Sequence, residues 1–194
     1  IRELYEPDWS RRWLWDRSYR ESRTPSCPSM LLELLSHQNF ADMKYGLDPT
    51  FRFTVSRAVY KGMLKYLSNR YGCDYVVQPL PVSSIGVSFA GKDKAEIRWI
   101  PENDETEPTA KPEGFILYTR IDDGGFDNGT VIRDYTRNGD TFSTKAAIKP
   151  GHVYSFRIVA YNEGGMSFPS EVVSIGRPSS DTEMGKTVLI VNNF

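Results

Sequence analysis

The sequence predicts an α/β segment followed by an all-β sandwich, because the spacing of its apolar residues changes near Pro79. Before that residue the apolar side chains fall into one continuous run and one helical repeat, and after it they alternate with polar ones. A continuous run is typical of a strand that is buried on both faces, whereas alternation is typical of a strand with one face on the core. The predicted α/β part is a fragment consisting of a buried strand and an amphipathic helix.

Composition and charge narrow the possible classes of protein. The 194 residues are 39% hydrophobic and 13% aromatic, which suits a globular protein with a packed core. The net charge of −1 gives no electrostatic basis for binding nucleic acid. Residues 1–78 carry a net charge of +3 and the remainder −4, which favours two modules. No apolar run reaches the roughly 18 residues of a membrane-spanning helix, so we expect no transmembrane segment.

The predicted buried strand contains one carboxylate, Glu33, within the apolar run "SMLLELL" of residues 29–35. A carboxylate held in an apolar wall is suited to general acid–base chemistry, because desolvation disfavours its charged form. In the alternative interpretation, the strand ends near Leu32, and Glu33 reaches solvent or an arginine such as Arg12 or Arg17. Glu33 is therefore the candidate catalytic residue of the chain.

The predicted helix follows in "GLDPTFRFTVSRAVYKGMLKYLSNRYG". Asp48 is suited to the N-cap. Pro49 is suited to the first helical position, because a backbone N–H there would have no hydrogen-bond acceptor within the helix. Gly72 is suited to the end of the helix. Apolar residues recur at helical spacing and predict one buried stripe, made of Phe51, Val55, Val59, Met63, Tyr66 and Leu67.

Three alternating runs predict the strands of the sandwich: "AEIRWI" (95–100), "GFILYTR" (114–120) and "HVYSFRIVAYN" (152–162). Turn clusters such as "DDGGFDNG" and "KPG" separate them, which is typical of a β-sandwich of about 100 residues. The aspartates of the first cluster do not follow the spacing of an EF-hand and are interpreted as turn residues.

The β part resembles a fibronectin type III domain over about residues 80–178. The residues that carry this resemblance are Trp99, the segment "IKPGHVYSFRIVAYNEGGMSFPSE", and within it the run Ala160 to Ser170. The resemblance implies that Trp99 lies in the core and that the Tyr154 hydroxyl bonds to nearby backbone in a tyrosine corner. Domains of this family are spacers or binding modules.

The first part resembles the C-terminal end of the zinc-dependent N-acetylmuramoyl-L-alanine amidases of the amidase-3 type. The matching residues are Pro28, Leu31, Glu33, Asn39 and Asp42, then Gly62 and Tyr66 in the helix, whereas Leu35 and Ser36 depart from the family pattern. The resemblance implies that Glu33 is the general base for a zinc-bound water that cleaves the amide between glycan and stem peptide of peptidoglycan. The zinc ligands of that family lie upstream, so we expect zinc in the full-length parent and no metal ligand in this fragment.

The order of these parts is similar to that of large secreted Bacteroidetes proteins labelled xanthan lyases. It predicts the C-terminal part of an amidase-like α/β domain over 1–78, a fibronectin type III domain over 79–178, and a linker with the first strand of a further domain, "TVLIVNNF", over 179–194. The expected localisation is secreted or periplasmic, at the cell envelope. The alternatives to an amidase are a non-catalytic spacer or carbohydrate-binding module and a part of a polysaccharide lyase-like enzyme.

The segment "WSRRWLWDRSYRESR" interleaves aromatic and basic residues, which together can stack on sugars and hold anionic groups. Arg17 and Arg20 are therefore candidate substrate-binding residues for peptidoglycan or another polysaccharide. In the alternative interpretation the tryptophans pack on the sheet and the arginines face water.

The histidines and cysteines of the chain are few. His37 is expected in a loop and His152 at the surface, because neither has a partner at metal-ligand spacing. Cys27 and Cys73 either pair with each other or remain two separate buried thiols.

Overall fold

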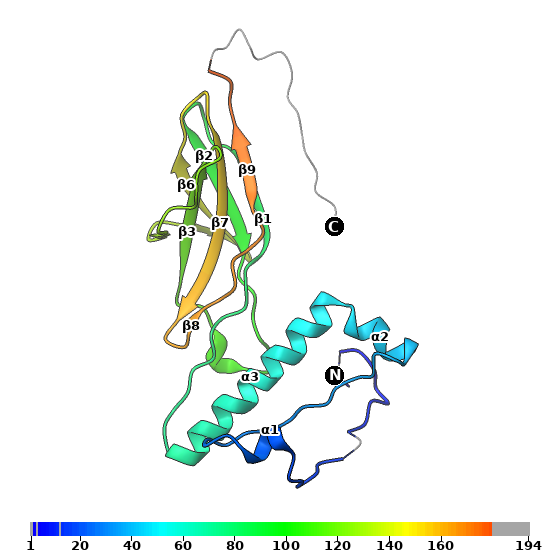
Figure 1. The fold of residues 1–194 in the computed structure, drawn as a ribbon. Coiled ribbons are helices and arrows are strands. Elements are labelled where there is room, and N and C mark those ends of the chain that lie inside the picture. Colours follow the sequence, from blue (N-terminus) through cyan, green and yellow to red (C-terminus); the bar gives the residue numbers. More distant parts are fainter. Residues whose placement is uncertain (1, 3, 12, 180–194) are drawn as a thin grey trace. The chain divides into compact units, whose positions relative to one another are not determined.

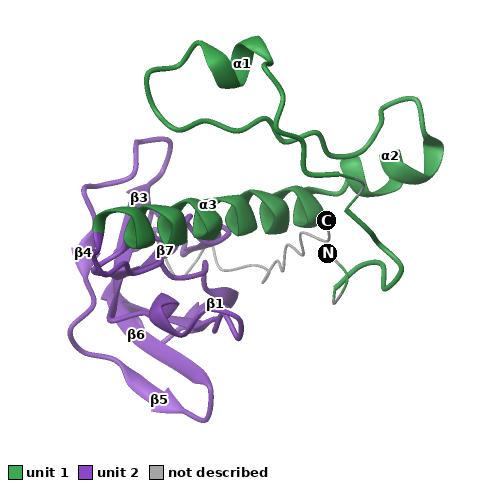
Figure 2. Ribbon diagram, turned by 90° about the horizontal axis from the view of Figure 1, so that it is seen from below, with its two compact units in different colours: residues 1–71 green, residues 72–194 purple. Residues whose placement is uncertain are grey.

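The computed structural model describes residues 2, 4–11 and 13–179, which form two compact units (Figures 1 and 2). Unit 1 covers Ile1–Tyr71 and contains the described helices α1 to α3, and unit 2 covers Gly72–Phe194 and contains the strands. The division falls between residues 71 and 72, whereas the sequence suggested a boundary after residue 78. The strand predicted in "TVLIVNNF" lies outside the described residues.

The helices of unit 1 are α1 (Arg20–Arg23), α2 (Phe40–Gly46) and α3 (Pro49–Tyr71). The start of α2 is capped by Asn39, whose side chain accepts a hydrogen bond from the backbone N–H of Ala41. The prediction for α3 is confirmed at both ends. The Asp48 carboxylate accepts the backbone N–H of Thr50 at 2.9 Å, and Gly72 follows the helix with a φ of +64°.

The packing of α3 differs from the predicted stripe along its length. Phe51 is 1% exposed, and its ring contacts those of Tyr5, Trp9 and Tyr45 at centroid distances between 5.0 and 6.1 Å. Farther along the helix the stripe is solvent-exposed, with Met63, Tyr66 and Leu67 at 52%, 49% and 44%. Burial of the predicted apolar face is therefore confirmed only at the start of α3.

The predicted buried strand in residues 28–35 was wrong. This segment has no regular secondary structure, and Met30, Leu31 and Leu32 are 62%, 46% and 53% exposed. A strand buried on both faces requires neighbouring strands to pair with its backbone. No strand occurs among the residues of unit 1 that the structure describes, so the apolar run has no sheet to join.

Unit 2 is a sandwich of two antiparallel sheets (Figure 1). The strands of the first sheet, in spatial order, are β1 (Ser83–Phe89), β2 (Lys94–Ile100), β6 (Thr141–Ala147) and β5 (Thr136–Asn138). Those of the second are β4 (Thr130–Val131), β3 (Gly114–Ile121), β7 (Val153–Asn162) and β8 (Gly165–Met166), and β9 (Val173–Gly176) also pairs with β7. A short 3-10 helix, η1 (Pro108–Ala110), precedes β3.

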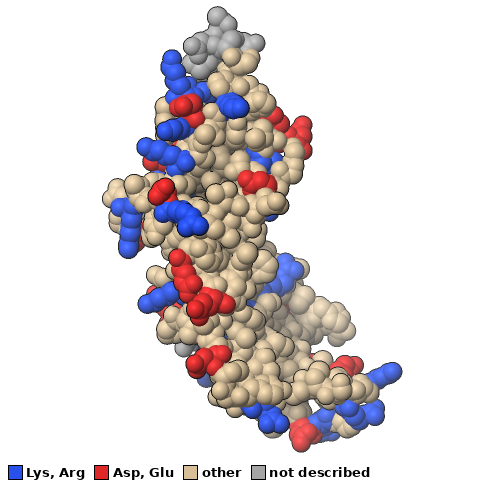
Figure 3. All heavy atoms as spheres, turned by 90° about the vertical axis from the view of Figure 1, so that its left-hand side faces the viewer, with Lys and Arg blue, Asp and Glu red and all other residues tan. Residues whose placement is uncertain are grey.

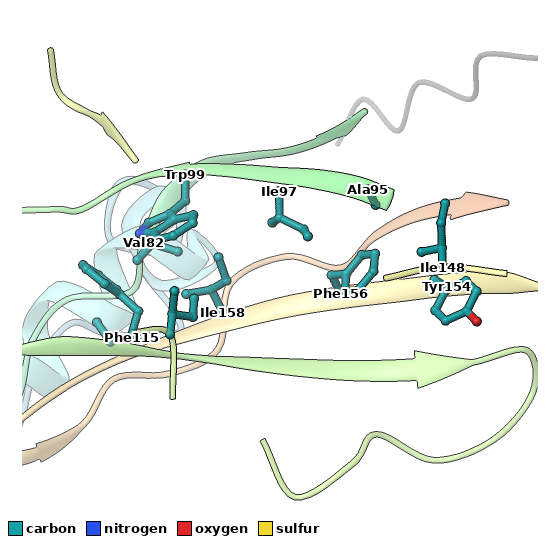
Figure 4. Close-up of a cluster of buried hydrophobic side chains, with 11 residues drawn as sticks. Val82, Ala95, Ile97, Trp99, Phe115, Ile148, Tyr154, Phe156 and Ile158 are labelled. Atoms are coloured by element: carbon teal, nitrogen blue, oxygen red, sulfur yellow. The ribbon is translucent and has the colours of Figure 1, made fainter. Parts of the chain in front are cut away.

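The core of the sandwich lies between the two sheets and is built by alternate residues of the long strands (Figure 4). In β2 these residues are Ala95, Ile97 and Trp99, each 0% exposed, as the alternation predicts. Phe156 and Ile158 of β7 are also 0% exposed and lie in the same cluster. The strand prediction for these two elements is therefore confirmed.

The tyrosine corner is present. The hydroxyl of Tyr154, which is 6% exposed, accepts a hydrogen bond from the backbone N–H of Lys149 at 3.1 Å. This bond ties the turn before β7 to the first residues of the strand.

The run Ala160–Ser170 closes the second sheet through its polar side chains. The hydroxyls of Ser167 and Ser170 accept the backbone N–H groups of Ala160 and Ile158 at 3.0 and 2.9 Å. Side-chain oxygens thus accept hydrogen bonds from β7 backbone where the strand next to it is interrupted between β8 and β9.

Candidate functional site

An exposed aromatic pair in unit 1 is the first candidate site. Trp13 and Trp15 are 64% and 56% exposed, and their ring centroids lie 5.5 Å apart at an interplanar angle of 50°. The guanidinium carbon of Arg17 lies 4.4 Å from the centroid of the Trp15 ring. We name these three residues the aromatic platform. They form a surface that combines two apolar ring faces with a cation.

The two arginines predicted to bind substrate differ in their surroundings. Arg17 is in contact with Trp15, which places it in the aromatic platform. Arg20 is the exposed first residue of α1, where its backbone carbonyl accepts the hydroxyl of Thr24 at 2.7 Å. Trp13 and Trp15 have no sheet of unit 1 to pack against, because the described part of that unit contains no strand.

Glu33 is exposed and lies in the irregular segment between α1 and α2. The apolar wall that the sequence predicted around its carboxylate is not observed. The residues that follow Glu33 in the chain line an open hollow of about 490 Å³. Its lining residues are Leu34, Leu35, His37, Met43, Gly46, Phe51, Arg52, Val55 and Ser56. Glu33 is not among these residues, and its catalytic role stays a prediction.

The residues present do not fit a zinc centre. Among the described residues, no group of three or more His, Cys, Asp or Glu side chains lies close enough together to hold a metal ion. His37 lines the hollow of unit 1 together with mainly apolar residues. His152 belongs to unit 2, where its Nδ1 lies 2.7 Å from a carboxylate oxygen of Asp122.

Asp122 and His152 form a hydrogen-bonded pair at the surface, at one end of the sandwich. The other carboxylate oxygen of Asp122 accepts the backbone N–H of Val153 at 2.9 Å. Two hydrogen bonds lower the pKa of the Asp122 carboxyl: the one with His152 has the larger effect, and the one from the backbone of Val153 the smaller. Asp122 also has a φ of +50°, a left-handed conformation that aspartate and asparagine tolerate better than most residues.

We expect the stability of the sandwich to fall on acidification through Asp122. A carboxyl whose pKa is lower in the folded state stabilises the fold above its unfolded pKa of about 3.9, and this contribution is lost as the pH falls through the folded pKa. The variant Asp122→Asn tests this, because asparagine tolerates the same backbone conformation but cannot ionise. In thermal unfolding between pH 7 and pH 3, the melting temperature of the variant should fall less below about pH 4 than that of the wild-type chain. Equal pH dependence of the two proteins would contradict this assignment.

Both cysteines are free thiols. Cys27 and Cys73 are unpaired and exposed, whereas the two interpretations expected a disulfide or two buried thiols.

Within the described part of the chain, the helices are too short or too polar to cross a membrane. On the face drawn in Figure 3, basic and acidic side chains are interspersed.

A further cluster was missed by the sequence reasoning. Arg120 of β3 and Arg157 of β7 both lie near the ring of Phe126, which belongs to the loop after β3. The signal in the sequence is alternation, which places Tyr118 and Arg120 of β3, and likewise Arg157 of β7, on the faces opposite the core residues. The partner residues on β7 depend on the strand register, which periodicity alone does not define.

The strand order and the tyrosine corner define unit 2 as an antiparallel sandwich with the fold of a fibronectin type III domain. No family model matches the chain.

Solved structures similar to the chain include a fibronectin III domain. The third fibronectin III domain of the human KIAA0343 protein is 12% identical, with a TM-score of 0.42, over 58% of this chain and 93% of that one. The twitchin kinase region from C. elegans is 17% identical, with a TM-score of 0.43, over 56% of this chain and 18% of that one. The chain therefore corresponds to less than a fifth of the twitchin region. A structure named BhCBM56 is 10% identical, with a TM-score of 0.35, over 50% of this chain and 98% of that one.

Proposed function

We propose that this chain is a non-catalytic module that binds polysaccharide through the aromatic platform of unit 1. The observation that supports this proposal is the exposed pair Trp13 and Trp15 with the Arg17 guanidinium over one ring. We further propose that the whole protein is secreted or periplasmic, where such a ligand occurs.

Both indoles of the aromatic platform are exposed to solvent. Tryptophan is a large apolar side chain with one polar group, and a soluble protein gains little by leaving two of them next to each other in water. Ring faces of this kind can pack on the apolar faces of sugar rings. Arg17 adds a cation that can bind a carboxylate of an anionic glycan or its peptide.

A catalytic function has less support from the structure. Glu33 is exposed, and the described residues bring no set of metal ligands together. The zinc-dependent amidase remains a prediction for the full-length parent. Binding through the aromatic platform requires neither Glu33 nor a metal, so the two hypotheses can be tested separately.

The proposal predicts saturable binding of the 194-residue chain to purified peptidoglycan sacculi in a sedimentation assay. The variant Trp13→Ala/Trp15→Ala should bind at least about tenfold more weakly, because a central aromatic contact typically contributes 1.4 kcal/mol or more. Tyr66→Ala is a matched control, because Tyr66 is an aromatic residue of α3 that is 49% exposed, and its affinity should not change. Absence of saturable binding, or equal affinity of all three proteins, would contradict the proposal.

A further inference from the structure

Two arginines share one aromatic ring on the outer face of the second sheet. The guanidinium carbons of Arg157 and Arg120 lie 4.2 and 5.3 Å from the centroid of the Phe126 ring, and Arg157 also lies 5.2 Å from that of Tyr118. Arg120 donates a hydrogen bond from Nη2 to the Ser155 hydroxyl at 3.1 Å. We name these five residues the arginine cluster.

The strand register explains why these residues meet. In the antiparallel pair of β3 and β7, Tyr118 lies opposite Arg157, and Arg120 lies opposite Ser155. Residues two apart on a strand point to the same face, so the four side chains form one patch. The loop after β3 then returns Phe126 over this patch.

The positive charge of the arginine cluster has no acidic partner in the described structure. No carboxylate there forms an ion pair with Arg120 or Arg157, and the Nε atoms of both are buried without a hydrogen-bond acceptor. The two nearby acids in sequence have other partners. Asp127 accepts the backbone N–H groups of Thr119 and Gly129, and Asp122 pairs with His152.

Such an arrangement favours an anionic ligand. Placing two cations beside one ring without a counter-charge is unfavourable, because like charges repel and partial burial weakens their hydration. The cation–π contacts offset part of this cost and hold the guanidinium groups in place. A planar guanidinium donates two parallel hydrogen bonds to an oxyanion, so a carboxylate that binds at the Nη groups would neutralise the positive charge, whereas the buried Nε groups stay out of its reach.

The position of the arginine cluster favours a saccharide over a peptide as the carrier of the oxyanion. The cluster lies on β3 and β7, each of which is paired with other strands on both sides. Their backbone groups are occupied, so an acidic peptide cannot add to them as an extra strand. A ligand must be recognised by side chains alone, and the exposed hydroxyl of Ser174, which also bonds to the buried Ser155 hydroxyl at 2.9 Å, can form a hydrogen bond with a hydroxyl group of a sugar.

We propose that the arginine cluster is an oxyanion-binding site for the carboxylate of a uronic acid in an acidic polysaccharide. This site lies in unit 2 and does not depend on the aromatic platform of unit 1. Binding should weaken with increasing salt, since it relies on the attraction between charges near the surface.

The test measures binding of the 194-residue chain to alginate, a polyuronate. The variant Arg120→Gln/Arg157→Gln should bind at least tenfold more weakly than the wild-type chain. Arg137→Gln is the matched control, because Arg137 also contacts a ring, that of Phe142 at 5.5 Å, and its affinity should match that of the wild type. The two arginine substitutions should lower the affinity for alginate by the same factor in the Trp13→Ala/Trp15→Ala background as in the wild-type chain, which separates this proposal from the function proposed for unit 1.

Two further measurements complete the test. Sodium glucuronate should shift the NMR signals of the Arg120 and Arg157 Nε–H groups in the wild-type chain, a result that does not require a folded variant. Absence of these shifts, or equal loss of alginate affinity in Arg137→Gln, would overturn the proposal. Polyglutamate that binds as tightly as alginate at the same arginines would overturn the assignment to a saccharide.

Discussion

Trp99→Ala is expected to lower the free energy of unfolding of the sandwich by about 3–5 kcal/mol, the range measured for truncating large buried aromatic residues. The Trp99 side chain is 0% exposed and lies between the two sheets. Its ring contacts those of Phe115, Phe142 and Tyr135 at centroid distances of 5.3, 6.0 and 6.4 Å. Alanine would leave a cavity that these rings can fill only in part.

The measurement is native-state hydrogen exchange of the backbone amides of Phe156 and Ile158, which reports on unit 2 alone. Trp99→Phe is the control and should have a smaller effect. The indole Nε1–H is buried without an acceptor among the described residues, so phenylalanine removes an unsatisfied donor while it keeps an aromatic ring. A change below about 1 kcal/mol for Trp99→Ala would contradict the assigned role of this residue.

Asn162→Ala is expected to destabilise the sandwich by about 3 kcal/mol, since it removes several buried hydrogen bonds at once. The side chain is 7% exposed, and the two hydrogens of its amide nitrogen are shared among the backbone carbonyls of Val77, Thr109 and Lys111, which lie at 2.9, 3.1 and 3.2 Å. Its carbonyl oxygen accepts the N–H of Gly164 at 2.9 Å. One side chain thus connects the segment before β1, the loop around η1 and the turn after β7.

Asn162→Asp provides a sharper comparison than alanine. Aspartate keeps an acceptor for Gly164 but places a carboxylate oxygen against three carbonyl oxygens, so we expect a larger loss of stability than with alanine. Asn138→Ala in the exposed strand β5 is the matched control and should change the stability by less than about 0.5 kcal/mol. The stability of the three variants would be measured by unfolding in urea, with hydrogen exchange of the backbone amides as the readout. Equal stability of Asn162→Asp and the wild-type chain would contradict the role of Asn162 as a buried hydrogen-bond donor.

Local chemistry explains the elements that were predicted well. The start and end of α3 depend on Asp48, Pro49 and Gly72, whose effects act within a few residues. The strands β2 and β7 follow from alternation, and Trp99 and Tyr154 occupy the core and the corner that the fibronectin type III resemblance implies. These predictions did not require knowledge of distant residues.

Of the predicted substrate-binding residues, Arg17 lies on the ring of Trp15, so the interleaved pattern of aromatic and basic residues did indicate a cluster. The interpretation of Glu33 depended on a buried strand, and an apolar run alone does not define whether a strand will form. The apolar residues around Glu33 are exposed because the described part of unit 1 provides no neighbouring strand.

By itself, the sequence determined the limits of the long helix, the alternation of the main strands and the residues of the sandwich core, because these depend on capping, on side-chain periodicity and on apolar burial. Only the tertiary structure decided which residues of different strands meet. The pairing of β3 with β7 brings Arg120 and Arg157 to the same ring, although they are far apart in the chain. A shift of two residues in that register would keep the core residues of both strands on the inner face but would separate Arg157 from Tyr118, and periodicity does not distinguish registers that differ by two residues.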